Sequence, residues 1–394
     1  MIGANYKIIH IASDEKFIDA AIYIFEKAFP GSNHFIIPKS RFNRKLIYVK
    51  EHDNIELVPN NRFLLKYLLH RIQDYDWVIL HSLNEFNSTL FISSGEQGKF
   101  VGIFWGAELY TKEVFPDKEF LGKFTSSINL PNIIPTFKDK LRMTLSTLFR
   151  QDQALVKGSI KQAASKLSYF AVPYEEEFNF FQNKGIIPHY SRFIPFTYYP
   201  LEFILKGNEH IHVNGNDILI GNSANYTNNH LEVFYKINEI GIGNRKVILP
   251  LSYGDAQYGD YIHYQGVSIF GSGLISLRQF IPLEQYTLTM QRCGIVIMNH
   301  YRQQAIGNIV MMIWMGAKVY LNESNSFYNY LKRIGVKVFS IDTDLTNENK
   351  RVFTNLEESE AMENRRIISA MFSETTVAGA LRKSLEKIHF KQVD

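Results

Sequence analysis

The sequence predicts an α/β protein built from two doubly wound, Rossmann-like domains. Three observations support this fold class. Short apolar runs alternate with segments of helical periodicity, which favours parallel sheets covered by helices. The alternation is interrupted at residues 195–213, where prolines and a glycine break regular structure, and it then restarts. A chain of 394 residues is long enough for two domains of ordinary size.

In the first half, the segment 14–28 has helical spacing, with Phe17, Ile18 and Phe25 on its apolar stripe. A second helix is expected at 61–72 and a short one at 86–91. Apolar runs rich in β-branched and aromatic residues predict the strands between them. The strand candidates of this half are 6–11, 35–37, 46–49, 77–81 and 99–104.

The second half repeats the pattern. One of its helices, 282–293, is expected to begin with Pro282 in its first turn. The helix candidates are 229–240, 255–264, 282–293 and the apolar run 309–317. The strand candidates are 217–222, 246–251, 267–270, 294–298, 318–322 and 336–340. The expected domains are 1–200 and 214–370, with a final helix at 371–394 packing back on the first domain.

The composition describes a folded protein of a reducing compartment. Hydrophobic residues make up 45% and charged residues 21% of the chain, which excludes an intrinsically disordered protein. The single Cys293 excludes an intramolecular disulfide and a cysteine-based zinc site. The first apolar stretch, 8–12, lacks the flanks of a signal peptide, and no apolar run approaches the roughly 20 residues of a membrane span.

The segment 131–170 is basic and partly amphipathic. Such a segment can lie on an anionic membrane surface, and a pair of ordinary surface helices with solvated lysines is the alternative. Its charged residues up to position 166 are Lys138, Lys140, Arg142, Arg150, Lys157, Lys161 and Lys166, against Asp139 and Asp152.

The loop 299–308 is the most informative polar stretch of the chain. It follows the strand 294–298 and leads into an apolar helix. Free N–H groups at a helix N-terminus, together with the helix dipole, favour an anion at such a place. Arg302, Gln303, Gln304 and Asn308 supply further donors, and Gly307 allows close backbone approach. An ordinary polar connection between strand and helix is the alternative.

A second donor-rich loop follows the strand 217–222. Gly221 allows close approach of a ligand to the backbone, and Asn222, Ser223 and Asn225 can donate to a diphosphate. Helix capping by the same residue types is the alternative explanation.

The segment 104–110 places Glu108 after a strand, beside aromatic residues and a glycine. A carboxylate there can act as a general base toward a sugar hydroxyl, whereas a solvated loop glutamate is the plain alternative. His10 and Asp14, at the end of the first strand, are rival candidates for the base.

Metal and nucleotide motifs give negative indications. The triplet Asp74–Asp76 precedes its strand and lies at the wrong end for a metal–nucleotide site, and Asp342–Asp344 resembles turn chemistry. The chain has no G-x-x-x-x-G-K-[ST], H-E-x-x-H, G-x-S-x-G or G-x-G-x-x-G sequence. We therefore expect no metal and no cofactor, with positive side chains and helix N-termini stabilising a departing diphosphate.

Two doubly wound domains facing a central cleft constitute the GT-B arrangement of many glycosyltransferases, in which ligands lie beyond the carboxyl ends of the strands. Several segments together resemble one family, the TDP-N-acetylfucosamine:lipid II N-acetylfucosaminyltransferases of enterobacterial common antigen synthesis. Their order and spacing agree from about residue 75 to 345. The matching segments are 104–110, 220–223 with the helix containing His230, 247–254, 302–308, and 321–322 with Asn325 and Phe327.

This resemblance implies transfer of a 4-acetamido-4,6-dideoxygalactose-like sugar from a dTDP-sugar to a polyprenyl-diphosphate-linked saccharide, with inversion or retention. It implies a first domain that binds the acceptor, a second domain that binds the donor, and a peripheral location on the cytoplasmic face of the inner membrane. Tyr253 is expected to contact the base, and Asn322 and Asn325 to lie near the nucleotide or sugar. No nucleic-acid partner is expected. A non-catalytic sugar-nucleotide or polysaccharide-binding protein, or a transferase with a soluble acceptor, are the alternatives.

Overall fold

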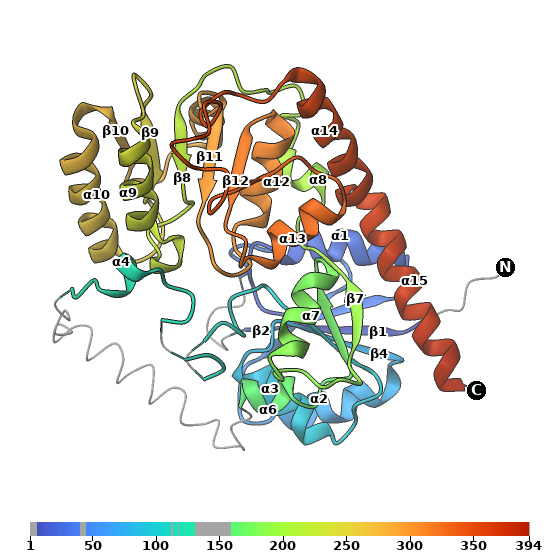
Figure 1. The fold of residues 1–394 in the computed structure, drawn as a ribbon. Coiled ribbons are helices and arrows are strands. Elements are labelled where there is room, and N and C mark those ends of the chain that lie inside the picture. Colours follow the sequence, from blue (N-terminus) through green and yellow to red (C-terminus); the bar gives the residue numbers. More distant parts are fainter. Residues whose placement is uncertain (1–5, 40–44, 112, 117, 131–158, 394) are drawn as a thin grey trace. The chain divides into compact units, whose positions relative to one another are not determined.

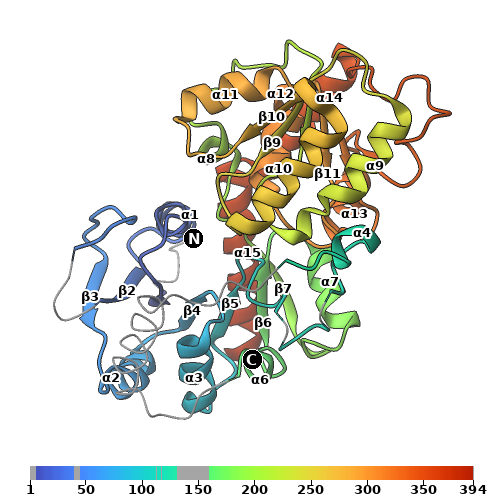
Figure 2. The same ribbon diagram turned by 90° about the vertical axis from the view of Figure 1, so that its left-hand side faces the viewer.

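The computed structural model describes residues 6–39, 45–111, 113–116, 118–130 and 159–393 (Figure 1). The chain divides into two compact units. Unit 1 contains residues 1–116, 132–200 and 374–394, and unit 2 contains residues 117–131 and 201–373. Each unit has one parallel sheet with helices on its faces (Figure 2), so the predicted fold class is confirmed.

Unit 1 is built on a seven-stranded sheet with the order β3-β2-β1-β4-β5-β6-β7, in which all neighbours are parallel. Its strands are β1 (Ile8–Ile11), β2 (Asn33–Lys39), β3 (Ile55–Pro59), β4 (Trp77–His81), β5 (Phe100–Ile103), β6 (Tyr169–Val172) and β7 (Arg192–Pro195). Its helices are α1 (Ile18–Ala28), α2 (Leu64–Arg71) with the short η1 (Ile72–Asp74), α3 (Glu85–Ser94), α6 (Ile160–Ala164), α7 (Glu175–Asn183) and α15 (Glu374–Val393).

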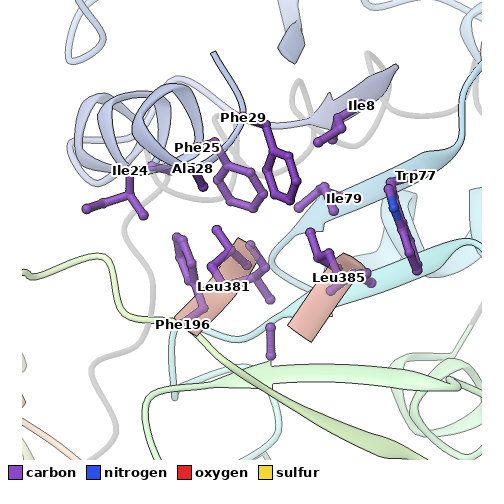
Figure 3. Close-up of a cluster of buried hydrophobic side chains, with 14 of the residues drawn as sticks. Ile8, Ile24, Phe25, Ala28, Phe29, Trp77, Ile79, Phe196, Leu381 and Leu385 are labelled. Atoms are coloured by element: carbon purple, nitrogen blue, oxygen red, sulfur yellow. The ribbon is translucent and has the colours of Figure 1, made fainter. Parts of the chain in front are cut away.

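The carboxyl-terminal helix α15 completes the core of unit 1. It packs against α1 and β7. Figure 3 shows Leu381 and Leu385 directed at a cluster that includes Phe25 of α1 and Phe196, and all four side chains are buried. The last segment of the chain therefore supplies part of the apolar surface that holds the first segment in place.

Unit 2 is built on a six-stranded parallel sheet with the order β10-β9-β8-β11-β12-β13. Its strands are β8 (Ile218–Ile220), β9 (Val247–Pro250), β10 (Leu274–Leu277), β11 (Ile295–Met298), β12 (Lys318–Leu321) and β13 (Phe339–Ser340). Its helices are α4 (Lys123–Ser126), α8 (Leu201–Leu205), η3 (Tyr226–Asn228), α9 (His230–Ile240), α10 (Ala256–Phe270), η4 (Gly271–Gly273), α11 (Leu283–Gln291), α12 (Ile306–Met315), α13 (Ser326–Arg333) and α14 (Glu358–Phe372).

Two predicted strands are wrong. Residues 46–49 form a loop, because the N–H groups of residues 47–49 bind the Asp14 carboxylate instead of a neighbouring strand. The strand of this region is β3. Residues 267–270 are the last turn of α10, which ends at Gly271, and the strand is β10. The strands β6 and β7 were not among the candidates.

Residues 118–130, expected in the first domain, belong to unit 2. The N–H and hydroxyl of Thr125 both donate to Glu232 of α9, and Ile128 and Leu130 pack against the core of that unit. Most of the basic segment 131–170 lies outside the described residues, which resume at 159 with α6 and β6. Within the described parts of the chain, no helix is long and apolar enough to cross a bilayer.

Candidate functional site

The loops of each unit gather at one edge of its sheet, because every strand of a parallel sheet ends at the same side. In unit 2 this edge carries the loops that follow β8, β11 and β12, which contain most of the predicted donor-binding residues. We call it the donor edge.

The buried side chain of Asn228 joins two loops of the donor edge. Its Oδ1 accepts from the Asn222 N–H at 2.9 Å and lies 3.0 Å from His300 Nε2. Its Nδ2 donates to the Ser223 hydroxyl at 3.3 Å and to the Asn225 carbonyl at 3.1 Å. Because Oδ1 can only accept, Nε2 of His300 carries the proton. The loops after β8 and β11 are therefore fixed to each other.

Gln304 strengthens this connection. Its Nε2 donates to Asn222 Oδ1 at 3.2 Å, and its Oε1 accepts from the Thr227 hydroxyl at 2.7 Å. The amide of Gln304 thus bonds the loop after β8 on both sides, which restricts its freedom to turn toward a ligand.

Asn322 and Asn325 fasten the loop after β11 from the other side. Asn322 Nδ2 donates to Asn299 Oδ1 at 3.0 Å, and Asn325 Nδ2 donates to the His300 carbonyl at 3.1 Å. Asn325 also caps α13 by accepting from the Phe327 N–H. Since both side chains are buried in these bonds, they shape the loop. That they lie near the nucleotide or sugar stays a prediction.

The N-terminus of α12 remains as the anion-binding feature of the donor edge. Ala305 precedes it with φ of 59° and provides no side-chain cap to the first-turn N–H groups. Gly307 and Asn308 are half-buried, and the half-buried Arg302 guanidinium donates to the Gln303 carbonyl at 2.9 Å. A helix N-terminus beside an arginine favours a phosphate group.

The remaining predicted donor-binding residues differ in exposure. Gln303 is buried, whereas Asn225 is exposed and caps η3 through its side chain. Tyr253, after β9, is 78% exposed, which suits a residue that contacts a base at the rim of a site. Gly221 adopts φ of 65°, and the atoms nearest to the position of a Cβ belong to the side chains of Asn228 and His230.

Glu108 lies at the corresponding edge of unit 1, after β5. Its carboxylate accepts from the N–H groups of Trp105 at 3.0 Å and Ala107 at 3.1 Å, and from the Ser82 hydroxyl. Burial raises the pKa of Glu108, and these donors offset part of that rise. A fixed carboxylate with a raised pKa is a better proton acceptor than an ordinary glutamate.

The rival bases are less suitable. Asp14 accepts from Lys39 at 2.8 Å and from the N–H groups of residues 47–49. Burial alone would raise the pKa of Asp14, but Lys39 and these N–H groups hold it at about 2, so it is a weak base. His10 has 0% exposure and lies inside the sheet core, out of reach of a substrate. These placements argue against both residues.

Asn228 and Asn229 were not among the predicted site residues, although both belong to the donor edge. Asn229 is buried with φ of 50°, and its Nδ2 donates to the carbonyls of Asn299 and Phe120 at 3.0 and 3.1 Å. The signal in the sequence was the polar run 228–230 beside a glycine-containing loop. Among the described residues, no group of three or more His, Cys, Asp or Glu side chains is arranged to hold a metal ion.

Comparison with known proteins places this geometry in context. A sequence model of the 4-alpha-L-fucosyltransferases, glycosyl transferase group 56, matches residues 138–382. The fold is similar to sucrose-phosphate synthase from Thermosynechococcus elongatus, with a TM-score of 0.62 at 9% identity over 98% of this chain and 100% of that one.

HepE from Anabaena, solved with UDP and glucose, has a TM-score of 0.60 at 12% identity over 97% of this chain and 100% of its own. The alpha,alpha-trehalose 6-phosphate synthase of Burkholderia multivorans reaches 0.54 at 9% identity over 99% of both chains. At such identities the likeness establishes the fold, which is that of GT-B glycosyltransferases.

We expect Gly221→Ala to disrupt the donor edge. An added Cβ would lie 2.6 Å from Asn228 Oδ1 and 2.8 Å from His230 Nε2, both in buried side chains. Gly241→Ala is the matched control, since Gly241 also has positive φ but nothing within 4 Å of the added atom. Urea denaturation should show Gly221→Ala to be less stable than the control by more than about 1 kcal/mol. Equal stabilities would contradict the packing described for this loop.

The buried histidines predict a loss of stability in acid. Burial lowers the pKa of His10, and it lowers those of His81, His230 and His300 to about 3. Between about pH 6.5 and pH 3 the unfolded chain binds protons that the folded protein does not. Stability therefore falls as the pH falls through this window, by up to about 1.4 kcal/mol per pH unit for each histidine.

Urea denaturation at about pH 7 and about pH 5 measures this slope. His230→Gln should make the slope shallower, whereas His210→Gln, at an exposed position, should leave it unchanged. A slope that does not depend on His230 would show that the pKa of this residue is not lowered in the folded protein.

Proposed function

The chain belongs to the 4-alpha-L-fucosyltransferase family, glycosyl transferase group 56, and we propose that it transfers a 4-acetamido-4,6-dideoxygalactose-like sugar from a dTDP-sugar to a polyprenyl-diphosphate-linked saccharide. The observation that carries this proposal is the donor edge, where Arg302 and the N-terminus of α12 lie together. A diphosphate is the group that these donors suit best.

HepE, which shares the fold, was solved with UDP and glucose. By analogy we place the diphosphate of the donor at the N-terminus of α12, with Gly307 and Asn308 supplying N–H groups and Arg302 supplying a positive charge. The exposed ring of Tyr253 suits a contact with the base. The loop after β8 would complete the site through Asn222 and Ser223, whose positions Asn228 fixes.

The reaction requires charge stabilisation on the leaving dTDP. We propose that Arg302 and the α12 dipole supply it without a metal ion, because a guanidinium and a helix N-terminus both favour developing negative charge. Burial keeps His300 neutral, and the neighbouring Arg302 lowers its pKa further. The positive charge of this loop is therefore assigned to Arg302.

Glu108 is proposed as the general base. It would take the proton from the acceptor hydroxyl while that oxygen attacks the anomeric carbon and the diphosphate leaves. The donors that hold the carboxylate fix its direction before substrate binds. The acceptor would be lipid-linked, with the protein bound peripherally to the cytoplasmic face of the inner membrane in surface polysaccharide synthesis. The basic segment proposed to contact this anionic surface lies largely outside the described residues.

Arg302→Ala is expected to raise the donor KM or lower kcat by about 10-fold or more, the scale of one lost charge-assisted contact. Initial rates against donor concentration measure both constants. Lys332→Ala is the control, because Lys332 is an exposed cation of unit 2 in the last turn of α13. Unchanged donor kinetics in Arg302→Ala would remove this residue from the site.

Glu108→Gln is expected to abolish transfer while donor binding survives, because the amide keeps the shape of the side chain but cannot accept the proton. Transfer assays and thermal shifts with dTDP-sugars measure the two properties separately. Glu175→Gln, at an exposed position of the same unit, is the control. A fully active Glu108→Gln would eliminate this base, and donor binding without any turnover in the unmodified protein would favour a binding protein.

A further inference from the structure

Three partly exposed aromatic rings lie together in unit 1. Phe17 precedes α1, Trp105 follows β5 and Tyr199 follows β7. The ring centroid of Phe17 is 5.6 Å from that of Trp105 and 5.4 Å from that of Tyr199. Tyr199 is 37% exposed. We call Phe17, Trp105 and Tyr199 the aromatic cluster, to which the reaction proposed above assigns no role.

The aromatic cluster adjoins the candidate base. The backbone N–H of Trp105 donates to Glu108 Oε1 at 3.0 Å. The backbone of the residue that carries the indole ring therefore also orients the carboxylate. Lys16 adds a positive charge at the border, with its Nζ 5.4 Å from the ring centroid of Phe17. Apolar ring surface, a carboxylate and an ammonium group are thus gathered at one edge of the sheet.

A chain of buried polar side chains lies beneath the aromatic cluster. His10 Nε2 is 3.2 Å from Asn33 Oδ1, and His10 Nδ1 is 3.0 Å from His81 Nε2. His81 Nδ1 is 2.9 Å from the Tyr198 hydroxyl. We call Asn33, His10, His81 and Tyr198 the buried chain.

The direction of every hydrogen bond in the buried chain follows from its first member. Asn33 Nδ2 donates to Glu26 and to the Phe29 carbonyl, so its Oδ1 is the acceptor for His10 Nε2–H. Neutral His10 then accepts at Nδ1 from His81 Nε2–H, and His81 accepts at Nδ1 from the Tyr198 hydroxyl. The proton of Tyr198 is therefore directed at His81 Nδ1.

This direction excludes a proton relay to Glu108, because the buried chain ends in an amide that cannot take up a proton. Its effect is to fix the Tyr198 ring, whose centroid lies 6.3 Å from that of Trp105 and 6.2 Å from that of Phe17. Buried polar groups are costly unless each finds its partner, so a satisfied chain specifies one arrangement. The aromatic cluster is consequently held in place before any ligand binds.

We propose that the aromatic cluster binds the apolar face of a sugar ring of the acceptor saccharide and presents one of its hydroxyls to Glu108. A sugar ring has C–H groups on its faces and hydroxyls at its rim. Ligand sites of this kind combine aromatic surface with a few placed polar groups. A hydrocarbon tail would gain nothing from the carboxylate and the ammonium at the border. This inference rests on the proposed function and specifies its acceptor side.

The indole N–H resonances of the protein test the inference without an activity assay. The chain has 3 tryptophans. Trp77 is buried, and Trp314 donates its indole N–H to the Glu209 carbonyl in unit 2. Trp105→Phe identifies the Trp105 signal. N-acetylglucosamine and its β-1,4-linked disaccharide should shift that signal saturably at millimolar concentrations, while the signals of Trp77 and Trp314 stay in place.

Two variants distinguish the role of the aromatic cluster from that of the buried chain. Tyr199→Ala should weaken the response several-fold, and Tyr198→Phe, which removes only the hydroxyl bonded to His81, should shift the Trp105 signal of the free protein and weaken binding. Tyr190→Ala and Tyr190→Phe are the controls, because Tyr190 is 60% exposed in the same unit and should change neither. A Tyr198→Phe protein with an unaltered Trp105 signal would contradict the support by the buried chain.

Two results would overturn the sugar site. One is a Trp105 signal that no saccharide shifts, and the other is a signal that shifts only with farnesyl diphosphate, which would assign the aromatic cluster to the isoprenoid. Thermal shifts with dTDP-sugars keep this outcome distinct from failure of the proposed function. A protein that dTDP-sugars stabilise but whose Trp105 signal no saccharide shifts would contradict this inference alone. A protein that no dTDP-sugar stabilises would contradict the proposed function.

Discussion

The donor edge depends on the buried amide of Asn228. Its oxygen is shared by a backbone N–H of the loop after β8 and by His300 of the loop after β11, and its nitrogen holds Ser223 and Asn225. A buried amide whose partners are missing costs about as much as the hydrogen bonds it forgoes. The two loops can therefore separate only together with the loss of several bonds. This cost turns two flexible connections into a surface of fixed shape at the N-terminus of α12.

Both units build their functional edges on neutral polar groups. In unit 1 the buried chain of Asn33, His10, His81 and Tyr198 carries no charge, and in unit 2 burial keeps His300 neutral. Because these buried side chains are neutral, they do not offset the electric fields of nearby charged groups. Glu108 in one unit and Arg302 in the other are the charges that we propose to contact a substrate at these edges. Electrostatic catalysis depends on such preorganised charges.

The sequence predicted most of the alternation of strands and helices, because hydrophobic periodicity reports directly which residues are buried, but it missed β6 and β7. It also located the loops after β8 and β11, since polar residues followed buried strands. The prediction failed where a side chain bound backbone groups that a strand would have used. The Asp14 carboxylate accepts from the N–H groups of residues 47–49 and keeps them out of the sheet. An apolar stretch at the end of α10 was likewise mistaken for a strand, because a short run cannot distinguish the two.

The roles of individual amides were beyond the reach of sequence reasoning. Asn322 and Asn325 are chemically able to bind a nucleotide, but the fold commits both to carbonyl and amide partners inside the protein. Asn229 was not among the predicted site residues, yet its Nδ2 donates to the carbonyls of both Asn299 and Phe120. The segment 118–130 follows the Glu108 loop in the chain and packs on unit 2. The same buried amide therefore holds Asn299 of the loop after β11 and Phe120 of the segment 118–130.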